Sequence, residues 1–145
     1  MRPSWLALGD MRKIPEHIYS KVLEIGLSIT NASERSDEQQ ESAALKELQL
    51  LAAELEESGN QDPFVLETLA DFTSDNEEAI RLYRRSIELV STHSGEPCYS
   101  KQTALAERLF VVGEEAEANQ LLQTALSKAI ESKDAEAEKE IRQLL

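Results

Sequence analysis

Residues 99–131 read YSKQTALAERLFVVGEEAEANQLLQTALSKAIE, with apolar side chains recurring at intervals of three and four on both sides of Gly113. This periodicity predicts two amphipathic helices, and the glycine predicts the tight turn between them. The inward positions of the two helices are Leu105, Ala106, Leu109, Ala118, Leu121, Leu122, Ala125, Ala129 and Ile130. Because helices joined by a short turn pack as antiparallel neighbours, this stretch predicts one helical hairpin.

Two further stripes of apolar residues lie near the N-terminus and predict helices at 14–30 and 37–58. Their members are Ile14, Ile18, Val22, Ile25, Ile29, Ala44, Leu48, Leu51 and Leu55. Ser36 predicts a capping box at the start of the second helix, and Gly59 is typical of a left-handed helix end. We therefore expect a first hairpin at about 14–58.

A second hairpin is predicted at about 62–91. Asp62 is a preferred N-cap residue, and Pro63 suits the first position of a helix of about eleven residues. Ser74, followed by a glutamate three residues later, predicts a capping box for the next helix. The apolar positions of the two helices are Phe64, Leu66, Leu69, Ala70, Phe72, Ala79, Ile80, Tyr83, Ile87 and Val90.

The last apolar stripe follows a turn at Lys133 and consists of Ala137, Ile141 and Leu144, which predicts a short terminal helix. No segment of the sequence alternates in the manner of a strand, so the predicted fold class is all-α. The expected parts are an N-terminal arm at 1–13 and one helical domain at 14–145, with antiparallel hairpins at about 14–58, 62–91 and 98–131 and a cap at 134–145.

The charge of the chain excludes several classes of partner. Its 145 residues include 28 acidic and 15 basic side chains, which gives a formal net charge of −13. Acidity of this size repels nucleic-acid phosphates and anionic lipid, so we expect neither nucleic-acid nor membrane binding. Basic partners are favoured, although the acidity would also be explained by solubility alone.

The cysteine and apolar content favour a cytoplasmic protein. Cys98 is the single cysteine, so the chain has no internal disulfide and no zinc cluster of several thiolates. The apolar run near the N-terminus is too short for a secretory segment. No stretch approaches the roughly 18 apolar residues of a membrane span.

Catalytic chemistry is not indicated by the sequence. The histidines are His17 and His93, and the second lies five residues before Cys98. None of these spacings matches a helix-borne zinc pair, and the carboxylate pairs lie at helix starts or on polar faces. We therefore expect no enzyme activity, no cofactor and no metal site.

The hairpin at 99–131 resembles the tetratricopeptide repeat. The resemblance rests on Leu105, Ala106, Leu109, Gly113, Ala118, Leu122 and Ala125, where small residues permit close helix approach. A weaker match occurs at Leu69, Ala70, Ala79, Tyr83 and Ser86. The resemblance implies a right-handed solenoid closed by a C-terminal capping helix, and a role in binding proteins or peptides. A helical bundle without repeats is the alternative.

In that family the inner face of the solenoid is formed by the first helix of each hairpin. The positions that correspond to this face here are Phe64, Glu67, Asp71, Ser100, Thr103, Glu107, Phe110 and Val111. Carboxylates beside apolar surface suit a ligand with Lys or Arg and would repel a C-terminal carboxylate. Solvated acids and core phenylalanines are the alternative interpretation of these residues.

The predicted function is therefore that of a non-enzymatic protein-binding module or adaptor that captures a basic protein or peptide. By analogy, toxin-neutralising proteins and effector chaperones are acidic proteins of this kind that bind basic partners. Two alternatives stay open: a self-assembling structural unit that forms a homo-oligomer, and an acidic inhibitor that mimics DNA through residues 31–60, which hold eight acidic and two basic residues.

Overall fold

The computed structural model describes residues 16–93 and 98–145, and within them every regular element is an α-helix. The helices are α1 (Glu16–Glu34), α2 (Glu38–Glu57), α3 (Pro63–Phe72), α4 (Asn76–His93), α5 (Tyr99–Val111), α6 (Glu115–Glu131) and α7 (Ala135–Leu144). The all-α prediction is confirmed. The N-terminal arm expected at 1–13 lies outside the described residues.

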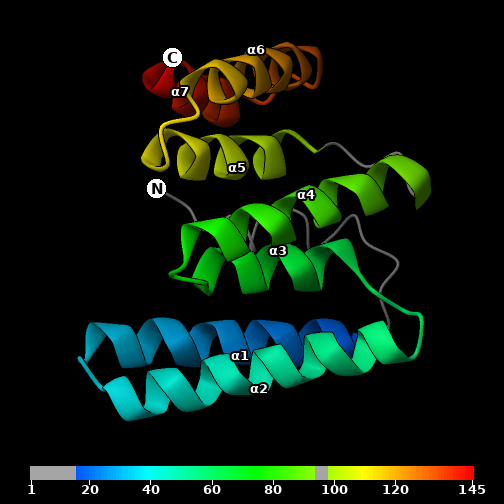
Figure 1. Ribbon diagram of the computed structural model, residues 1–145, viewed down its shortest axis with the longest axis vertical. Helices are drawn as coiled ribbons and strands as arrows, with labels where there is room; N and C mark the ends of the chain where they lie inside the picture. Colours follow the sequence, from blue (N-terminus) through cyan, green and yellow to red (C-terminus); the bar gives the residue numbers. More distant parts are fainter. Residues whose placement is uncertain (1–15, 94–97) are drawn as a thin grey trace.

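The helices are arranged as antiparallel neighbours in the order of the chain. Figure 1 shows α1 and α2 at one end, α3 and α4 in the middle, and α5, α6 and α7 at the other end. The most extensive contacts join α1 to α2, α3 to α4, and α5 to α6. Contacts of α2 with α3, α4 with α5, and α6 with α7 connect these pairs. Each helix therefore buries its apolar stripe against the next one along the chain.

Two glycines and one Asp-Pro pair end and start helices as the sequence predicts. Gly59 and Gly113 follow α2 and α5 with φ angles of 74° and 87°, a region that an L side chain rarely adopts. Asp62 accepts hydrogen bonds from the backbone N–H groups of Phe64 (2.8 Å) and Val65 (3.4 Å), with Pro63 at the first helical position. These local signals place both ends of the α2–α3 connection.

Both predicted Ser capping boxes are wrong by one position. Asp37, not Ser36, caps α2 by accepting from the N–H of Gln40 at 3.1 Å, while Ser36 has a left-handed φ of 57°. Asp75, not Ser74, accepts from the N–H of Glu77 at 3.2 Å in front of α4. In each case the neighbouring carboxylate reaches the free N–H groups of the first turn.

The interior contains two clusters of apolar side chains. The larger runs from α1 to α7 and includes Leu48, Ala106, Leu122 and Ile141. The smaller lies where α1, α2 and α3 meet and consists of Val22, Leu51, Leu55, Phe64 and Val65. The predicted stripes supply most of these residues.

Two details of the first and sixth helices differ from the expectation. α1 continues four residues beyond residue 30, because Ala32 is completely buried and extends the apolar stripe by one turn. Ile130, predicted to face inward, is 47% exposed, whereas its neighbour Ala129 is buried.

None of the helices in the described part of the chain is both long and apolar enough to cross a membrane.

Candidate functional site

The two predicted binding residues at the start of α3 are buried. Phe64 lies in the smaller apolar cluster, with its ring centroid 5.4 Å from that of Tyr19 in α1. The carboxylate of Glu67 accepts from Lys101 Nζ of α5 at 2.6 Å, and both side chains are completely buried. The expected exposure of Phe64 and Glu67 is therefore wrong, because each has a partner on a neighbouring helix.

Asp71, the third predicted residue of α3, has an internal partner on α4. It is half-buried and accepts a hydrogen bond from Tyr83 Oη at 2.5 Å. Burial, followed by the neighbouring Asp71 carboxylate, raises the pKa of Tyr83 well above its usual range. Tyr83 therefore keeps its proton, and its hydroxyl donates a hydrogen bond to Asp71 that joins α4 to α3.

Most of the predicted residues of α5 also face the interior. Thr103 is buried, and its hydroxyl donates to the carbonyl of Tyr99 at 2.7 Å. Ser100 is half-buried, and Phe110 packs against the larger apolar cluster. The structure therefore does not gather the predicted set on one open face.

Glu107 is the predicted residue whose environment is most unusual. Burial raises the pKa of this half-buried carboxyl, the carboxylate of Glu140 in α7 raises it further, and Arg108 opposes the shift. Arg108 is itself engaged, because it donates to Asn76 Oδ1 (3.0 Å) and to the carbonyl of Ala70 (3.2 Å). Val111, one turn beyond Glu107, is 68% exposed.

The charges of Glu107 and Glu140 thus act on each other across the contact between α5 and α7, and the two residues are named the acidic pair. Neither carboxylate has an ion pair or hydrogen bond within the described part of the chain. Sequence reasoning missed Glu140, because position 140 was assigned to a cap and its approach to α5 depends on how α7 packs.

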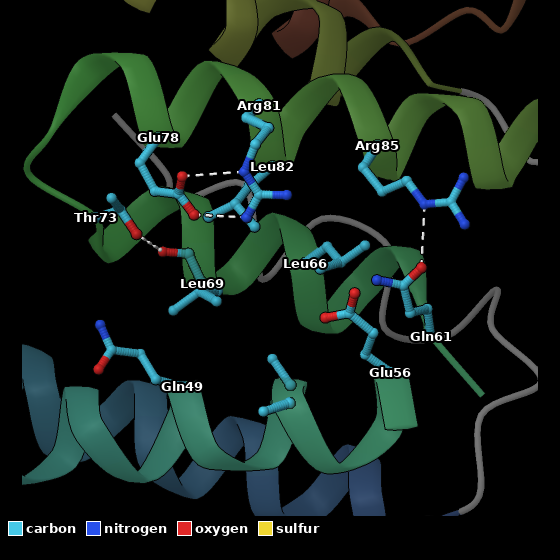
Figure 2. A pocket seen from close by; sticks show the side chains of 12 residues that line it. Gln49, Glu56, Gln61, Leu66, Leu69, Thr73, Glu78, Arg81, Leu82 and Arg85 are labelled. Atoms are coloured by element: carbon cyan, nitrogen blue, oxygen red, sulfur yellow. Dashed lines mark hydrogen bonds and ion pairs between the residues drawn. The ribbon is translucent and has the colours of Figure 1, made fainter. Parts of the chain in front are cut away.

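A groove of about 250 Å³ lies between α2 on one side and α3 with α4 on the other. Its floor is formed by side chains of Ala52, Ala53, Leu66, Leu69 and Leu82. Figure 2 shows Leu69 pointing from α3 toward α2, with Gln49 and Glu56 rising from α2 on the opposite side. The adjacent alanines of α2 were the sequence signal for this gap, since they fill less space than the leucines across from them.

The charged residues along the α4 side of the groove are paired. Arg81 makes two hydrogen bonds to Glu78, of 3.0 and 2.6 Å, which are visible in Figure 2 and raise the pKa of Arg81. Arg85 forms an ion pair with Glu88 at 3.1 Å and donates to Gln61 at 3.1 Å. These bonds hold the arginine side chains along α4.

Glu56 on the α2 side differs from the α4 residues. Of the charged residues that line the groove, it alone has no ion pair within residues 16–93 and 98–145. It does act on Arg81 through space, as one of the charges that raise the pKa of that guanidinium. The lining therefore combines apolar side chains with two glutamates and two arginines, and Glu56 is the one of these four with no ion pair in the described part of the chain.

Groups that could support catalysis or metal binding are sparse in this part of the molecule. No cluster of three or more His, Cys, Asp or Glu side chains suited to a metal occurs among the described residues. Burial raises the pKa of the half-buried Cys98 thiol, which disfavours the nucleophilic thiolate. His17 is exposed on α1, and the side chain of His93 lies outside the described residues.

Comparison with known proteins found no matching family model, no matching curated protein and no matching solved structure. The tetratricopeptide resemblance therefore rests on the residue spacing alone.

Proposed function

We propose that the chain is a non-enzymatic protein-binding module that captures a basic protein or peptide in the cytoplasm. In this proposal its helix pairs stack in a tetratricopeptide-like solenoid, with α7 as the cap. The observation that carries the proposal is the acidic pair of Glu107 and Glu140 between α5 and α7, with exposed Val111 beside it.

The electrostatics of this acidic pair favour a cationic ligand. Two carboxylates repel each other, and partial burial of Glu107 removes water that would screen the repulsion. A Lys or Arg side chain placed between them would relieve the repulsion and gain charge-assisted hydrogen bonds. The exposed methyl groups of Val111 add apolar contact for the stem of the same side chain.

The net charge acts over a longer range in the same direction. A charge of −13 attracts basic partners and speeds their association at low ionic strength. It also opposes close contact between two copies of the chain, which makes capture of another protein the better supported role than self-assembly. Neutralising a basic toxin or holding a basic effector would be functions of this kind.

A displayed library of random peptides tests the proposal without a known partner. Selection on the wild-type protein should enrich Lys and Arg beside apolar residues. Selection on E107Q/E140Q should lose this enrichment, and peptides selected on the wild type should bind the variant at least about tenfold more weakly. Affinity for the wild type should fall with added salt, since the charges are screened over about 8–10 Å.

The matched control is E115Q/E131Q, which removes the same charge from exposed positions of α6. It should keep both the enrichment and the affinity. Equal losses in the two variants would assign binding to bulk acidity, and unchanged selection by E107Q/E140Q would reject the site.

A further inference from the structure

The groove between α2 and α4 has the properties of a site for an apolar side chain. Leu66, Leu69 and Leu82, each at most 8% exposed, contribute a small apolar surface to its lining, together with two alanines of α2. Its volume of about 250 Å³ lies below the roughly 300–1,000 Å³ of most small-molecule pockets. One or two apolar side chains of a macromolecule fit this space better than a cofactor does.

The charged residues around the groove indicate which charge a ligand should carry. The lining itself holds Glu56 and Glu78 against Arg81 and Arg85, and both arginines are engaged in ion pairs, one with Glu78 and one with Glu88 outside the lining. α2, which carries Glu56, holds six glutamates and a single basic residue, Lys46. Exposed Glu57 and Glu54 extend the acidic surface of α2 beyond the groove. The acidic surface of α2 therefore favours a ligand that brings positive charge.

We propose that the groove binds a basic amphipathic helix of a partner protein, with one or two of its apolar side chains inserted against Leu66 and Leu69. Lys or Arg residues on the flank of that helix would face Glu56 and the acidic surface of α2. Helix-in-groove recognition places apolar anchors at intervals of three and four, which leaves the flanking positions free for charge pairing.

This inference rests on the proposed function in one respect, the basic character of the partner. The groove is lined by residues of α2, α3 and α4 and of the connections before and after α3, and it shares no residue with the acidic pair of Glu107 and Glu140. The two surfaces can therefore be tested separately.

The probe is a fluorescently labelled 14-residue peptide of Leu and Lys, ordered so that the leucines share one face of a helix. Fluorescence anisotropy measures its affinity for the wild-type protein and for two groove variants. Ala53→Phe fills the groove from an exposed position of α2, and Glu56→Lys reverses the charge at its edge. Each should weaken binding by at least about tenfold.

The matched controls are Ala116→Phe and Glu115→Lys, which make the same changes at exposed positions of α6. They should leave the affinity within about twofold of the wild type. Amide shifts in NMR spectra should locate the peptide, with larger changes at Leu66 and Leu69 than at the buried Leu109 of α5. Circular dichroism of Glu56→Lys verifies that a loss of binding occurs in a folded protein, should Ala53→Phe disturb α2.

Failure of the wild type to bind the peptide would overturn the inference, as would tight binding to Ala53→Phe and Glu56→Lys. Equal weakening by all four variants would also overturn it. The net charge of the protein and the size of the introduced side chain would then explain the effect, whatever their position. If the groove variants bind normally while E107Q/E140Q loses its selected peptides, the groove inference fails and the proposed function stands. If the groove variants lose binding while E107Q/E140Q keeps its selected peptides, the acidic pair is rejected as a binding site and the groove inference stands.

Discussion

Glu67 and Lys101 are separated by 34 residues in the sequence, yet their side chains meet at 2.6 Å in the interior between α3 and α5. Removing two charges from water is costly, and their attraction offsets that cost only while both are present. The pair therefore holds α3 and α5 in one relative position, because a shift would separate two buried charges.

Single substitutions of this pair should be strongly destabilising. We expect Glu67→Gln and Lys101→Met each to lower the free energy of unfolding by about 3–5 kcal/mol, since each leaves an uncompensated buried charge. The double variant Glu67→Leu/Lys101→Met should recover most of the loss, because it removes both charges. Urea unfolding measures all three, and single variants as stable as the wild type would show that the pair is solvated in solution.

The raised pKa of Glu107 predicts how the stability of the protein changes with pH. This pKa in the folded protein is raised above the ordinary value of 4.5, so folding favours the protonated form. The contribution of Glu107 to stability is therefore greatest below about pH 4.5 and falls as the pH rises through the folded pKa.

Glu107→Gln should remove this pH-dependent penalty. At neutral pH the variant should be more stable than the wild type, by less than about 1 kcal/mol because solvent reaches part of the side chain. The difference should shrink toward zero as the pH falls below about 4.5. Chemical unfolding from pH 3 to 8 measures it, with Glu115→Gln as an exposed control. A wild type that stays more stable at neutral pH would contradict the expectation.

At the scale of helices, small residues decide how closely α5 and α6 approach. Ala106 and Ala118 are completely buried, one on each helix, and belong to the larger apolar cluster. Gly113 reverses the chain between them with a φ of 87°. The short turn and the small side chains act together, because the turn leaves no room for a wider separation.

Enlarging either alanine should therefore overpack the hairpin. We expect Ala106→Leu and Ala118→Leu each to cost about 1–3 kcal/mol in urea unfolding, since neighbouring side chains must leave their preferred rotamers. Ala116→Leu, at an exposed position of α6, is the control and should change stability by less than about 0.5 kcal/mol. Neutral results at both buried sites would mean that α5 and α6 are not paired in this way.

At the scale of the whole molecule, the array of helices leaves an end that α7 covers. Ile141 is buried against the larger apolar cluster, while most of the other residues of α7 are polar. A terminal element of this kind closes an apolar surface that would otherwise face solvent.

A chain that ends at Ser132 should expose this surface. It should bind the uncharged dye Nile red more strongly than the full chain does, and it should self-associate in sedimentation experiments. Ile141→Val keeps the helix and should cost only about 0.5–1.5 kcal/mol without self-association. A truncated chain that remains monomeric and binds no dye would show that α7 does not protect the end.

The sequence alone was sufficient for the features that depend on neighbouring residues. Apolar spacing predicted the helices, because a helix brings residues three and four apart onto one face. Asp62, Pro63 and Gly113 predicted a start and a turn, because caps and left-handed turns are set by the chemistry of a few adjacent residues. The serine caps were misplaced because Asp37 and Asp75 offered a stronger acceptor one residue later.

The tertiary structure decided which of the acidic residues are available to a partner. Glu67 is paired in the interior because Lys101 comes from a helix that is distant in sequence, and the pKa of Glu107 is raised by burial and then by Glu140 of α7. The groove at Glu56 brings together two alanines of α2 and leucines of α3 and α4, which are distant in the sequence. Periodicity shows which side of a helix is apolar, whereas burial and charge pairing depend on the neighbouring helix that each side meets. That information appears only when the whole chain is packed.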